Sequence, residues 1–402
     1  MILLEMPSIK KMEALAQGMH ECISFAQGAL RIGGVDQHTK EYARQILLSD
    51  KADYYQDPLG IAPLRQRLSL TLSERYGAKI SPQQIFIGHG SLGALTSLVL
   101  TLLDAGDEVL LPEPTYPVYA SLVKLAKGVP VFTPAYELLP SKSDQRSAWA
   151  FNLELLKSAI TNQTKMVILS NPSNPTGVFL SPNELQELSW ICENKGIYLI
   201  VDEVYDDYVY EGTFSSSTPY AAHSQFTIRL GSFSKNFGMS GWRVGYAVAQ
   251  SEIIAAVGPV QAASISNPTV ISQYAALYAL EHREYTDHYA AILKKNRDVM
   301  CAFFDSLETS GIVSYGRPSA GFYLFFKTEN TDSTALVMDI LQRSKVALTP
   351  GADYGPSAKQ FVRLCFARDP ELIAQGIARL QKYFSAKHQL AFFDKSHIAA
   401  TL

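Results

Sequence analysis

The feature that most constrains this chain of 402 residues is a repeated alternation of short apolar runs with segments of helical spacing, which begins near residue 80. The apolar runs that we predict as strands are 84–87, 108–111, 129–132, 166–170 and 198–201. Helices are predicted between them over 91–103 and 119–126, and from the capping box at Ser181 to about Asn194. Such alternation predicts βαβ units and a large, mostly parallel, doubly wound α/β sheet.

The last hundred residues have a different pattern. Segments 272–288 and 290–307 are predicted helices, and the second carries the chain away from the sheet. Predicted strands (321–327, 361–366) and helices (333–344, 370–384) then indicate a smaller α+β domain. We therefore expect an N-terminal segment (1–45) that packs with the small domain, a large α/β domain (46–289), a small C-terminal α+β domain (290–387) and a tail (388–402).

Composition excludes several classes of protein. Hydrophobic residues make up 47% and charged residues 18%, which excludes a disordered or coiled-coil chain. With 35 Lys and Arg against 38 Asp and Glu, the net charge of −3 gives no reason to expect nucleic acid or a membrane surface as a partner. The N-terminus is too short and too acidic for a signal peptide, and no apolar run approaches the ~18 residues of a membrane span. These features predict a cytoplasmic globular protein, with an enzyme favoured by the size.

The four cysteines, Cys22, Cys192, Cys301 and Cys365, form no C-x-x-C pair. Their spacing fits neither a zinc site nor a dense disulfide framework, so no metal is predicted. Each is expected to be a small buried hydrophobic residue.

The turn after the first predicted strand, residues 88–93, has the sequence GHGSLG and matches the pattern G-x-G-x-x-G before a helix. Glu113 lies 20 residues beyond Gly93, where a dinucleotide site places its ribose-binding acid. Glycines at a helix N-terminus form an anion cradle from backbone N–H groups and the helix dipole. The pattern therefore predicts a phosphate site but leaves open which molecule carries the phosphate.

Three later segments carry the remaining chemistry: 171–177 (NPSNPTG), 201–205 (VDEVY), and 232–235 (SFSK) with 241–245 (GWRVG). Each is expected to follow an apolar strand and so to meet residues 88–93 at one edge of the sheet. Together they provide an amine, an aspartate, a tyrosine, an amide, hydroxyls and an arginine around a phosphate cradle. That set suits a phosphorylated aldehyde cofactor with a ring nitrogen.

In content and order, these segments resemble the fold-type I pyridoxal-phosphate enzymes, specifically the class I/II aminotransferases, over residues 20–385. The combination of S-x-S-K-x(5)-G-x-R with N-P-x-N-P-T-G carries the resemblance. It implies the fold-type I architecture and pyridoxal 5′-phosphate as cofactor. It also implies transfer of an amino group between an L-amino acid and a 2-oxo acid.

The resemblance implies a role for each matching residue. Lys235 is the lysine that forms the Schiff base and then serves as general base, and Asp202 pairs with the pyridine nitrogen. Tyr205 and Asn174 bind the ring 3′-oxygen, and Tyr116 stacks on the ring. The residues implied at the phosphate are Gly90, Ser91, Leu92, Ser232, Ser234 and Arg243.

Further matches concern the substrate and the assembly. Arg363 matches the arginine that binds the substrate α-carboxylate, where Asn174 also contributes, and Gly28 matches a glycine beside the substrate. Tyr55 matches a tyrosine that reaches the cofactor phosphate of the neighbouring subunit, which implies a homodimer with shared active sites. His89 is expected to be a structural histidine near the cofactor.

The chain departs from the family pattern after Gly28, where Ala29-Leu30-Arg31 replaces a usual proline two residues on. Residues 322–323 and 264–267 could line the side-chain pocket. The same core residues also serve enzymes that eliminate, cyclise or oxidise amino acids such as arginine derivatives, and the motifs do not separate these outcomes. A nicotinamide dehydrogenase and a regulatory protein on this fold are the alternatives from other classes.

Overall fold

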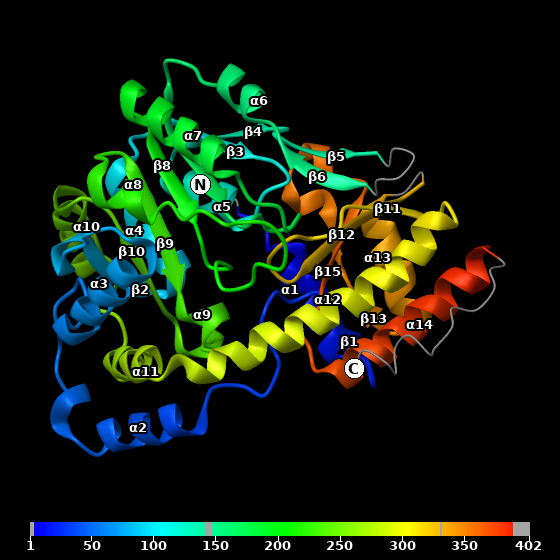
Figure 1. Ribbon diagram of the computed structural model, residues 1–402, viewed down its shortest axis with the longest axis horizontal. Coiled ribbons are helices and arrows are strands. Elements are labelled where there is room, and N and C mark those ends of the chain that lie inside the picture. The colour runs from blue at the N-terminus through cyan, green and yellow to red at the C-terminus, as the bar shows by residue number, and fades with distance from the viewer. Residues whose placement is uncertain (1–3, 141–146, 330–331, 389–402) are drawn as a thin grey trace.

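The structure, a computed structural model, describes residues 4–140, 147–329 and 332–388 (Figure 1). Its main sheet has seven strands in the order β2-β10-β9-β8-β7-β3-β4. The strands are β2 (Ile85–His89), β3 (Glu108–Pro112), β4 (Val129–Thr133), β7 (Thr164–Ser170), β8 (Tyr198–Asp202), β9 (Thr227–Ser232) and β10 (Val244–Val248). All neighbours pair in parallel except β10, which is antiparallel to both β9 and β2. The α/β fold is confirmed, with one antiparallel strand that makes the sheet mixed.

Both faces of this sheet are covered. On β7, Val167 and Leu169 belong to a different core cluster from Met166 and Ile168, because successive side chains of a strand point to opposite faces. Buried residues of α7 (Pro182–Lys195) lie in the first cluster, and those of α4 (Gly90–Leu102), α5 (Val118–Leu125) and α10 (Ser251–Ile265) lie in the second. The β2 end is packed by α3 (Ala62–Tyr76), α8 (Thr218–His223) and α11 (Val270–Glu281).

The predicted capping box at the start of α7 is confirmed. The Ser181 hydroxyl accepts a hydrogen bond from the Glu184 N–H at 3.3 Å, and the Glu184 carboxylate accepts one from the Ser181 N–H at 2.7 Å. Gly196 ends the helix in the left-handed conformation, with φ of 67°. Such caps satisfy backbone groups that a helix terminus leaves unpaired.

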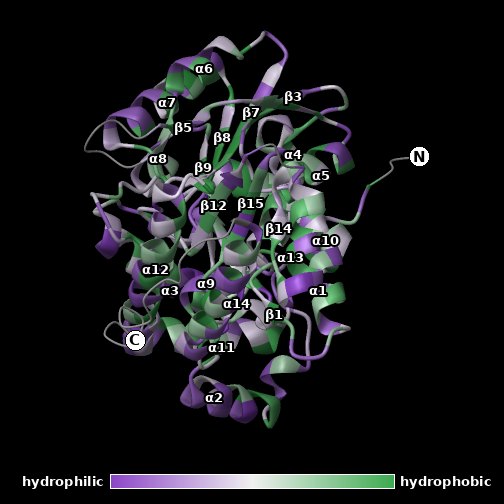
Figure 2. Cartoon of the chain, turned by 90° about the vertical axis from the view of Figure 1, so that its right-hand side faces the viewer, coloured by the Kyte–Doolittle hydropathy of each residue, from purple (hydrophilic) through white to green (hydrophobic). Residues whose placement is uncertain are grey.

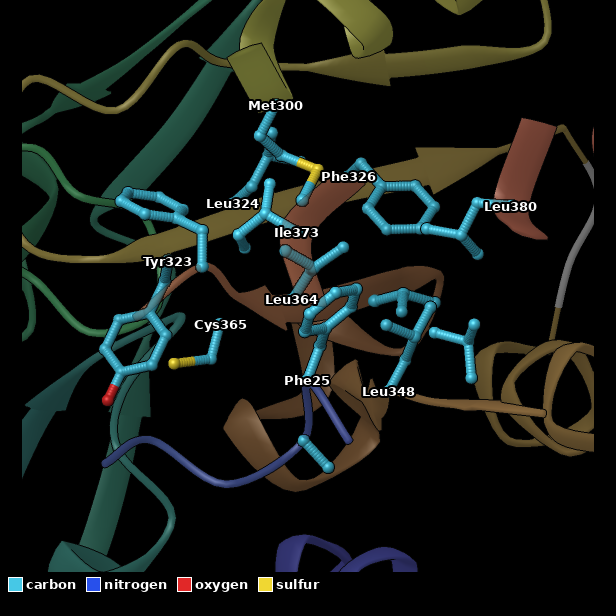
Figure 3. Packing of buried hydrophobic residues seen from close by; sticks show 14 of the residues in the cluster. Phe25, Met300, Tyr323, Leu324, Phe326, Leu348, Leu364, Cys365, Ile373 and Leu380 are labelled. Atoms are coloured by element: carbon cyan, nitrogen blue, oxygen red, sulfur yellow. The ribbon is translucent and has the colours of Figure 1, made fainter. Parts of the chain in front are cut away.

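A second, antiparallel sheet has the order β11-β12-β15-β14, with β11 (Val313–Tyr315), β12 (Tyr323–Thr328), β14 (Thr349–Pro350) and β15 (Phe361–Cys365). It packs with α12 (Thr286–Thr309), α13 (Ser333–Ser344) and α14 (Pro370–His388). Figure 3 shows Phe25, Leu324 and Leu364 in this core, with Tyr323 at its edge and its hydroxyl directed away from the cluster. The helix predicted over 272–288 is wrong at its end, because a 3₁₀ turn at Arg283–Tyr285 separates α11 from α12.

The N-terminal segment contacts both sheets. β1 (Ile23–Ser24) pairs in parallel with β13 (Val346–Ala347), and α1 (Ser8–Gln17) packs beside it. By contrast, α2 (Gln37–Leu47) packs on α11 of the large sheet. The division into domains stays a prediction, and residues 389–402 of the predicted tail lie outside the described residues.

The remaining elements are a hairpin, β5 (Tyr136–Leu139) and β6 (Ala148–Phe151), and the short helices α6 (Leu153–Ser158) and α9 (Phe233–Asn236). Figure 2 shows hydrophobic residues along strands such as β7 and β8, and hydrophilic residues along α2. No helix in the described part of the chain is long and apolar enough to cross a lipid bilayer.

A buried ion network links β9 and β10 to the residues that follow β8. Arg229, on β9, donates to Glu203 at 2.8 Å, to Asp206 at 2.7 Å and to the hydroxyl of Tyr246, on β10, at 2.9 Å. Asp206 also accepts a hydrogen bond from Asn236 at 2.7 Å. Arg229 is only 1% exposed, so these contacts replace the water that the charges lose.

We expect Arg229→Met to destabilise the protein by about 3–5 kcal/mol, because Glu203 would remain buried as an uncompensated charge. Urea unfolding followed by tryptophan fluorescence measures the change. The control is Arg44→Met, which removes an exposed guanidinium paired with Glu41 on α2 and is expected to leave the unfolding free energy nearly unchanged. Equal unfolding midpoints for the two variants would contradict the expectation.

Candidate active site

A cavity of about 470 Å³ lies where β8 and β9 end. The sequence-predicted residues that line it are Gly28, Ser91, Leu92, Tyr116, Asn174, Asp202, Tyr205, Ser232, Ser234, Lys235, Arg243 and Arg363. Asp202 is the last residue of β8 and Ser232 the last of β9. Because parallel strands place their carboxyl ends at one edge of the sheet, residues distant in sequence meet here.

The expectation that residues 241–245 follow a strand is wrong. Arg243 instead comes directly before β10, which begins at Val244. Since β10 runs antiparallel to its neighbours, its first residues lie beside their last ones, with Gly245 opposite Ser232 and Val244 opposite His89. Arg243 therefore reaches the same edge of the sheet by the opposite chain direction.

Arg243, Ser234 and the start of α4 form one polar cradle. The Arg243 guanidinium donates to the Ser234 hydroxyl at 3.4 Å and to the His89 carbonyl at 3.3 Å. Gly90 begins α4 with φ of +69°, and a Cβ there would lie 2.3 Å from Arg243 Nη2, so only glycine leaves room for the guanidinium. The Gly90 N–H donates to the Arg243 carbonyl at 3.0 Å. The N–H groups of Ser91 and Leu92 in the same turn, a guanidinium and a hydroxyl are the donors that a phosphate monoester accepts from. The cradle fits the phosphate of the expected cofactor.

Lys235 and Asp202 are the two ionisable groups at the centre of the cavity. Lys235 Nζ donates to the Gly28 carbonyl, and burial lowers the pKa of this amine to about 8. Burial raises the pKa of Asp202 to about 6, although the hydrogen bond that Tyr119 donates to its Oδ2 at 2.7 Å opposes the rise. Asp202 Oδ1 is buried and has no hydrogen-bond partner. A protonated ring nitrogen is a donor that would satisfy this oxygen.

A chain of polar contacts links Tyr205 to Arg363. The hydroxyls of Tyr205 and Tyr323 are 2.8 Å apart, and the Asn174 amide donates to Tyr205 at 3.5 Å. The same amide accepts a hydrogen bond from Arg363 Nη1 at 3.1 Å, while Arg363 Nη2 donates to the Ala26 carbonyl at 2.6 Å. Burial, followed by the neighbouring Tyr323, raises the pKa of Tyr205 well above its usual value. Tyr205 therefore stays a neutral hydroxyl at physiological pH.

Arg363 places a buried cation in the cavity. It lies in β15, is 1% exposed and pairs with no carboxylate among the described residues. Its guanidinium lies 4.3 Å from the ring centroid of Tyr323 and 5.4 Å from that of Tyr354, and its Nε has no hydrogen-bond partner. A buried charge is costly unless it is paired. The site is therefore suited to a carboxylate ligand.

Two tyrosines make contacts in the site that the sequence did not predict. Tyr119 binds Asp202, although we treated it only as part of a predicted helix. Tyr323 was expected as a pocket residue, but its contacts with Tyr205 and Arg363 were not. A Cβ on Gly28 would lie 2.1 Å from the Tyr323 hydroxyl, so this glycine is required by close approach. A tyrosine within an apolar strand, such as 321–327, is the signal that could have found Tyr323.

Other expected residues lie outside the cavity. Tyr55 is 87% exposed in the single chain. Glu113 is buried and accepts a hydrogen bond from the Ser357 N–H at 3.1 Å, which gives it a structural contact. Burial and the neighbouring Arg243 guanidinium lower the pKa of His89. Of the cysteines, all free, three are buried as expected and Cys22 is half-buried.

Comparison with protein families matches residues 20–380 to the family described as aminotransferase class I and II. The chain is 33% identical over 333 residues to an aspartate aminotransferase of Thermotoga maritima, a match that covers 83% of this chain and 84% of that protein. It is 31% identical over 338 residues to an aspartate aminotransferase of Sulfolobus acidocaldarius, with 82% of each covered.

Comparison with solved structures finds the same architecture. The structure of aspartate aminotransferase from Thermus thermophilus with maleate matches with a TM-score of 0.84 and 28% sequence identity. The match covers 94% of this chain and 97% of that one. The seven-stranded mixed sheet and the small sheet beside it are therefore shared with an enzyme of known fold.

The lowered pKa of Lys235 predicts unusual reactivity in the cofactor-free protein. Because only the unprotonated amine is nucleophilic, the rate of reductive methylation at Lys235 should rise with pH and reach half its maximum near pH 8, whereas an ordinary lysine titrates near 10.4. Peptide mass spectrometry after brief treatment with formaldehyde and cyanoborohydride measures the rate. The peptide that carries exposed Lys11 serves as internal reference, and parallel pH profiles at the two sites would contradict the expectation.

Proposed function

The chain belongs to the aminotransferase class I and II family, and from this premise we propose that the cavity around Lys235 is its catalytic centre. Enzymes of this class transfer amino groups with pyridoxal 5′-phosphate. The observation that carries the proposal is the grouping of a buried amine of lowered pKa, an unpartnered aspartate oxygen and an unpaired buried arginine in one cavity. Each of these groups lacks a partner that the cofactor or the substrate would supply.

The substrate pair is an L-amino acid and a 2-oxo acid. Among amino acids we favour an acidic donor such as L-aspartate, because the relatives from Thermotoga maritima and Sulfolobus acidocaldarius are named aspartate aminotransferases. Arg363 takes the α-carboxylate, since its unpaired guanidinium can bind both carboxylate oxygens. Asn174 and the Ala26 carbonyl hold that guanidinium in place.

In this proposal, Lys235 and Asp202 handle the protons of the reaction. Bound pyridoxal phosphate supplies an aldehyde that takes up the amine and a ring that withdraws electrons from the substrate Cα. Lys235 removes the Cα proton, a step that its pKa of about 8 favours near neutral pH. Asp202 holds a proton on the ring nitrogen through Oδ1, while Tyr119 keeps Oδ2 hydrogen-bonded and so favours the ionised carboxylate.

The other residues orient the bound molecules. Tyr205 and Asn174 would donate to the ring oxygen of the bound cofactor, and Tyr323 fixes the Tyr205 hydroxyl. Tyr116 packs edge-on against Tyr119 and forms one wall of the cavity. The phosphate would be held by Arg243, by the N–H groups of Ser91 and Leu92 and by the hydroxyls of Ser91, Ser232 and Ser234. Gly90 contributes the room that its missing side chain leaves for the Arg243 guanidinium, since its N–H already donates to the Arg243 carbonyl at 3.0 Å.

Single-substrate spectroscopy tests this proposal. The protein loaded with pyridoxal phosphate should lose its visible absorption lastingly when L-aspartate is added without any 2-oxo acid. Lys235→Ala should slow that change by roughly 10⁴-fold, because it removes the base. Absorption that recovers while the amino acid is consumed would instead indicate elimination, cyclisation or oxidation. A protein that takes up no pyridoxal phosphate would overturn the proposal.

We also propose that the active site is completed by a second copy of the chain. At the end of α2 and in the residues that follow it, four large apolar side chains are exposed: Leu47, Leu48, Tyr54 and Tyr55. Exposed apolar patches mark interaction sites in soluble proteins. In a homodimer, Tyr55 would reach the phosphate cradle of the partner, which accounts for its exposure in the single chain.

A mixing experiment tests the shared site. Tyr55→Ala should weaken cofactor binding, and Lys235→Ala should abolish activity, each as a homodimer. In a heterodimer of the two variants, one site combines an intact Lys235 with an intact Tyr55. Co-refolding equal amounts should therefore restore about a quarter of the wild-type activity, as expected for two-fold symmetric mixing. Activity no higher than the mean of the two separate variants would show that Tyr55 acts within its own chain or not at all.

A further inference from the structure

The cavity carries more positive charge than the proposed cofactor and α-carboxylate account for. Four cationic side chains line it, and Asp202 is its only acidic one among the described residues. Lys235 is the proposed base, Arg243 belongs to the phosphate cradle and Arg363 takes the α-carboxylate. The fourth cation, Lys10, has no assigned function.

Lys10 is held at the rim of the cavity by the start of α1. The preceding Ser8 donates through its N–H to Asp353 at 2.5 Å and through its hydroxyl to the same carboxylate at 3.0 Å. Ile9 is buried in the core cluster that also contains Tyr354. These contacts fix the backbone directly before Lys10. The Lys10 side chain therefore starts from a defined position beside the cavity.

The Lys10 ammonium is also free of intramolecular ion pairs in the described part of the chain. Its natural helix partner, Glu13, lies three residues further on but turns inward. The Glu13 carboxylate accepts hydrogen bonds from Arg31 at 2.7 Å and from the Ser24 hydroxyl at 2.5 Å. Lys10 is exposed at the rim, and its flexible four-carbon stem lets the ammonium reach an anion inside.

We propose that Lys10 binds the side-chain carboxylate of a dicarboxylic amino acid and so determines the preference for an acidic substrate. The inference rests on the proposed function, because it takes the α-carboxylate to be bound by Arg363. An acidic substrate would then be held at both ends by cations. A neutral substrate of the same shape would gain no binding free energy from Lys10.

Paired substrates and a matched variant test this inference with the loaded enzyme. L-Aspartate and L-asparagine are nearly equal in size and differ in the charge of the side chain. Lys10→Met should lower the ratio of kcat/KM for aspartate over asparagine about tenfold, as the loss of one charged contact predicts. Lys10→Arg should keep most of the ratio. Lys11→Met, on the same helix but not lining the cavity, is the control and should leave the ratio unchanged.

Binding of unreactive acids provides a readout that needs no turnover. Maleate has two carboxylates, and isocrotonate, the cis but-2-enoate, has the same cis four-carbon skeleton with one. Lys10→Met should raise the Kd of maleate about tenfold in a fluorescence titration and leave the Kd of isocrotonate unchanged. Equal effects on both acids, or equal effects of Lys10→Met and Lys11→Met, would overturn the inference. If the wild-type enzyme transfers amino groups only from neutral amino acids, the role of Lys10 fails while the proposed catalytic centre stands. If it converts no amino acid, the proposed function itself fails.

Discussion

The structure depends on the buried contact between Arg229 and the carboxylates of Glu203 and Asp206. Glu203 directly follows Asp202, the last residue of β8. Asp206 accepts a hydrogen bond from Asn236, which is the residue after Lys235. One guanidinium therefore ties together the two segments that carry the acid and the amine of the cavity. Because the network is buried, its charges cannot exchange their protein partners for water. Moving the two segments apart would therefore cost free energy. The contact of Arg229 with Glu203 and Asp206 therefore fixes the positions of Asp202 and Lys235 relative to each other.

The cavity itself is built from charges that the protein does not pair. Among the residues that the structure describes, Arg363 has no counter-ion and Asp202 Oδ1 has no donor, and burial lowers the pKa of Lys235. Each of these unpaired groups lowers the free energy of unfolding of the ligand-free protein. Binding of a ligand group with the opposite charge, or with the matching donor or acceptor, removes that cost. Folded proteins tolerate such conflicts at functional sites, where the ligand completes the interactions. The same reasoning singles out Lys10, whose helix partner Glu13 is already engaged.

The two parts of the chain meet at the cavity. The segment around residues 26–28 directly follows β1, which pairs with β13 in a two-stranded sheet of its own. Its carbonyl groups accept hydrogen bonds from Arg363, on the small sheet, and from Lys235, on the large one. A substrate held by Arg363 against Lys235 would thus lie between groups from both sheets. Helix α1, which precedes this segment in the chain, carries Lys10 at the rim of the same cavity.

From the sequence we could predict the alternation of strands and helices, a phosphate cradle at residue 90 and, through the family resemblance, the candidate site residues from Asn174 to Arg363. Local spacing, capping at Ser181 and the chemistry of the motifs were sufficient for these predictions, because each depends on neighbouring residues. The antiparallel direction of β10, the contact of Tyr119 with Asp202 and the contact of Tyr323 with Tyr205 are known only from the three-dimensional structure. Those contacts join residues 80 or more positions apart or depend on strand direction, and no local pattern records which distant partner packing will bring into reach.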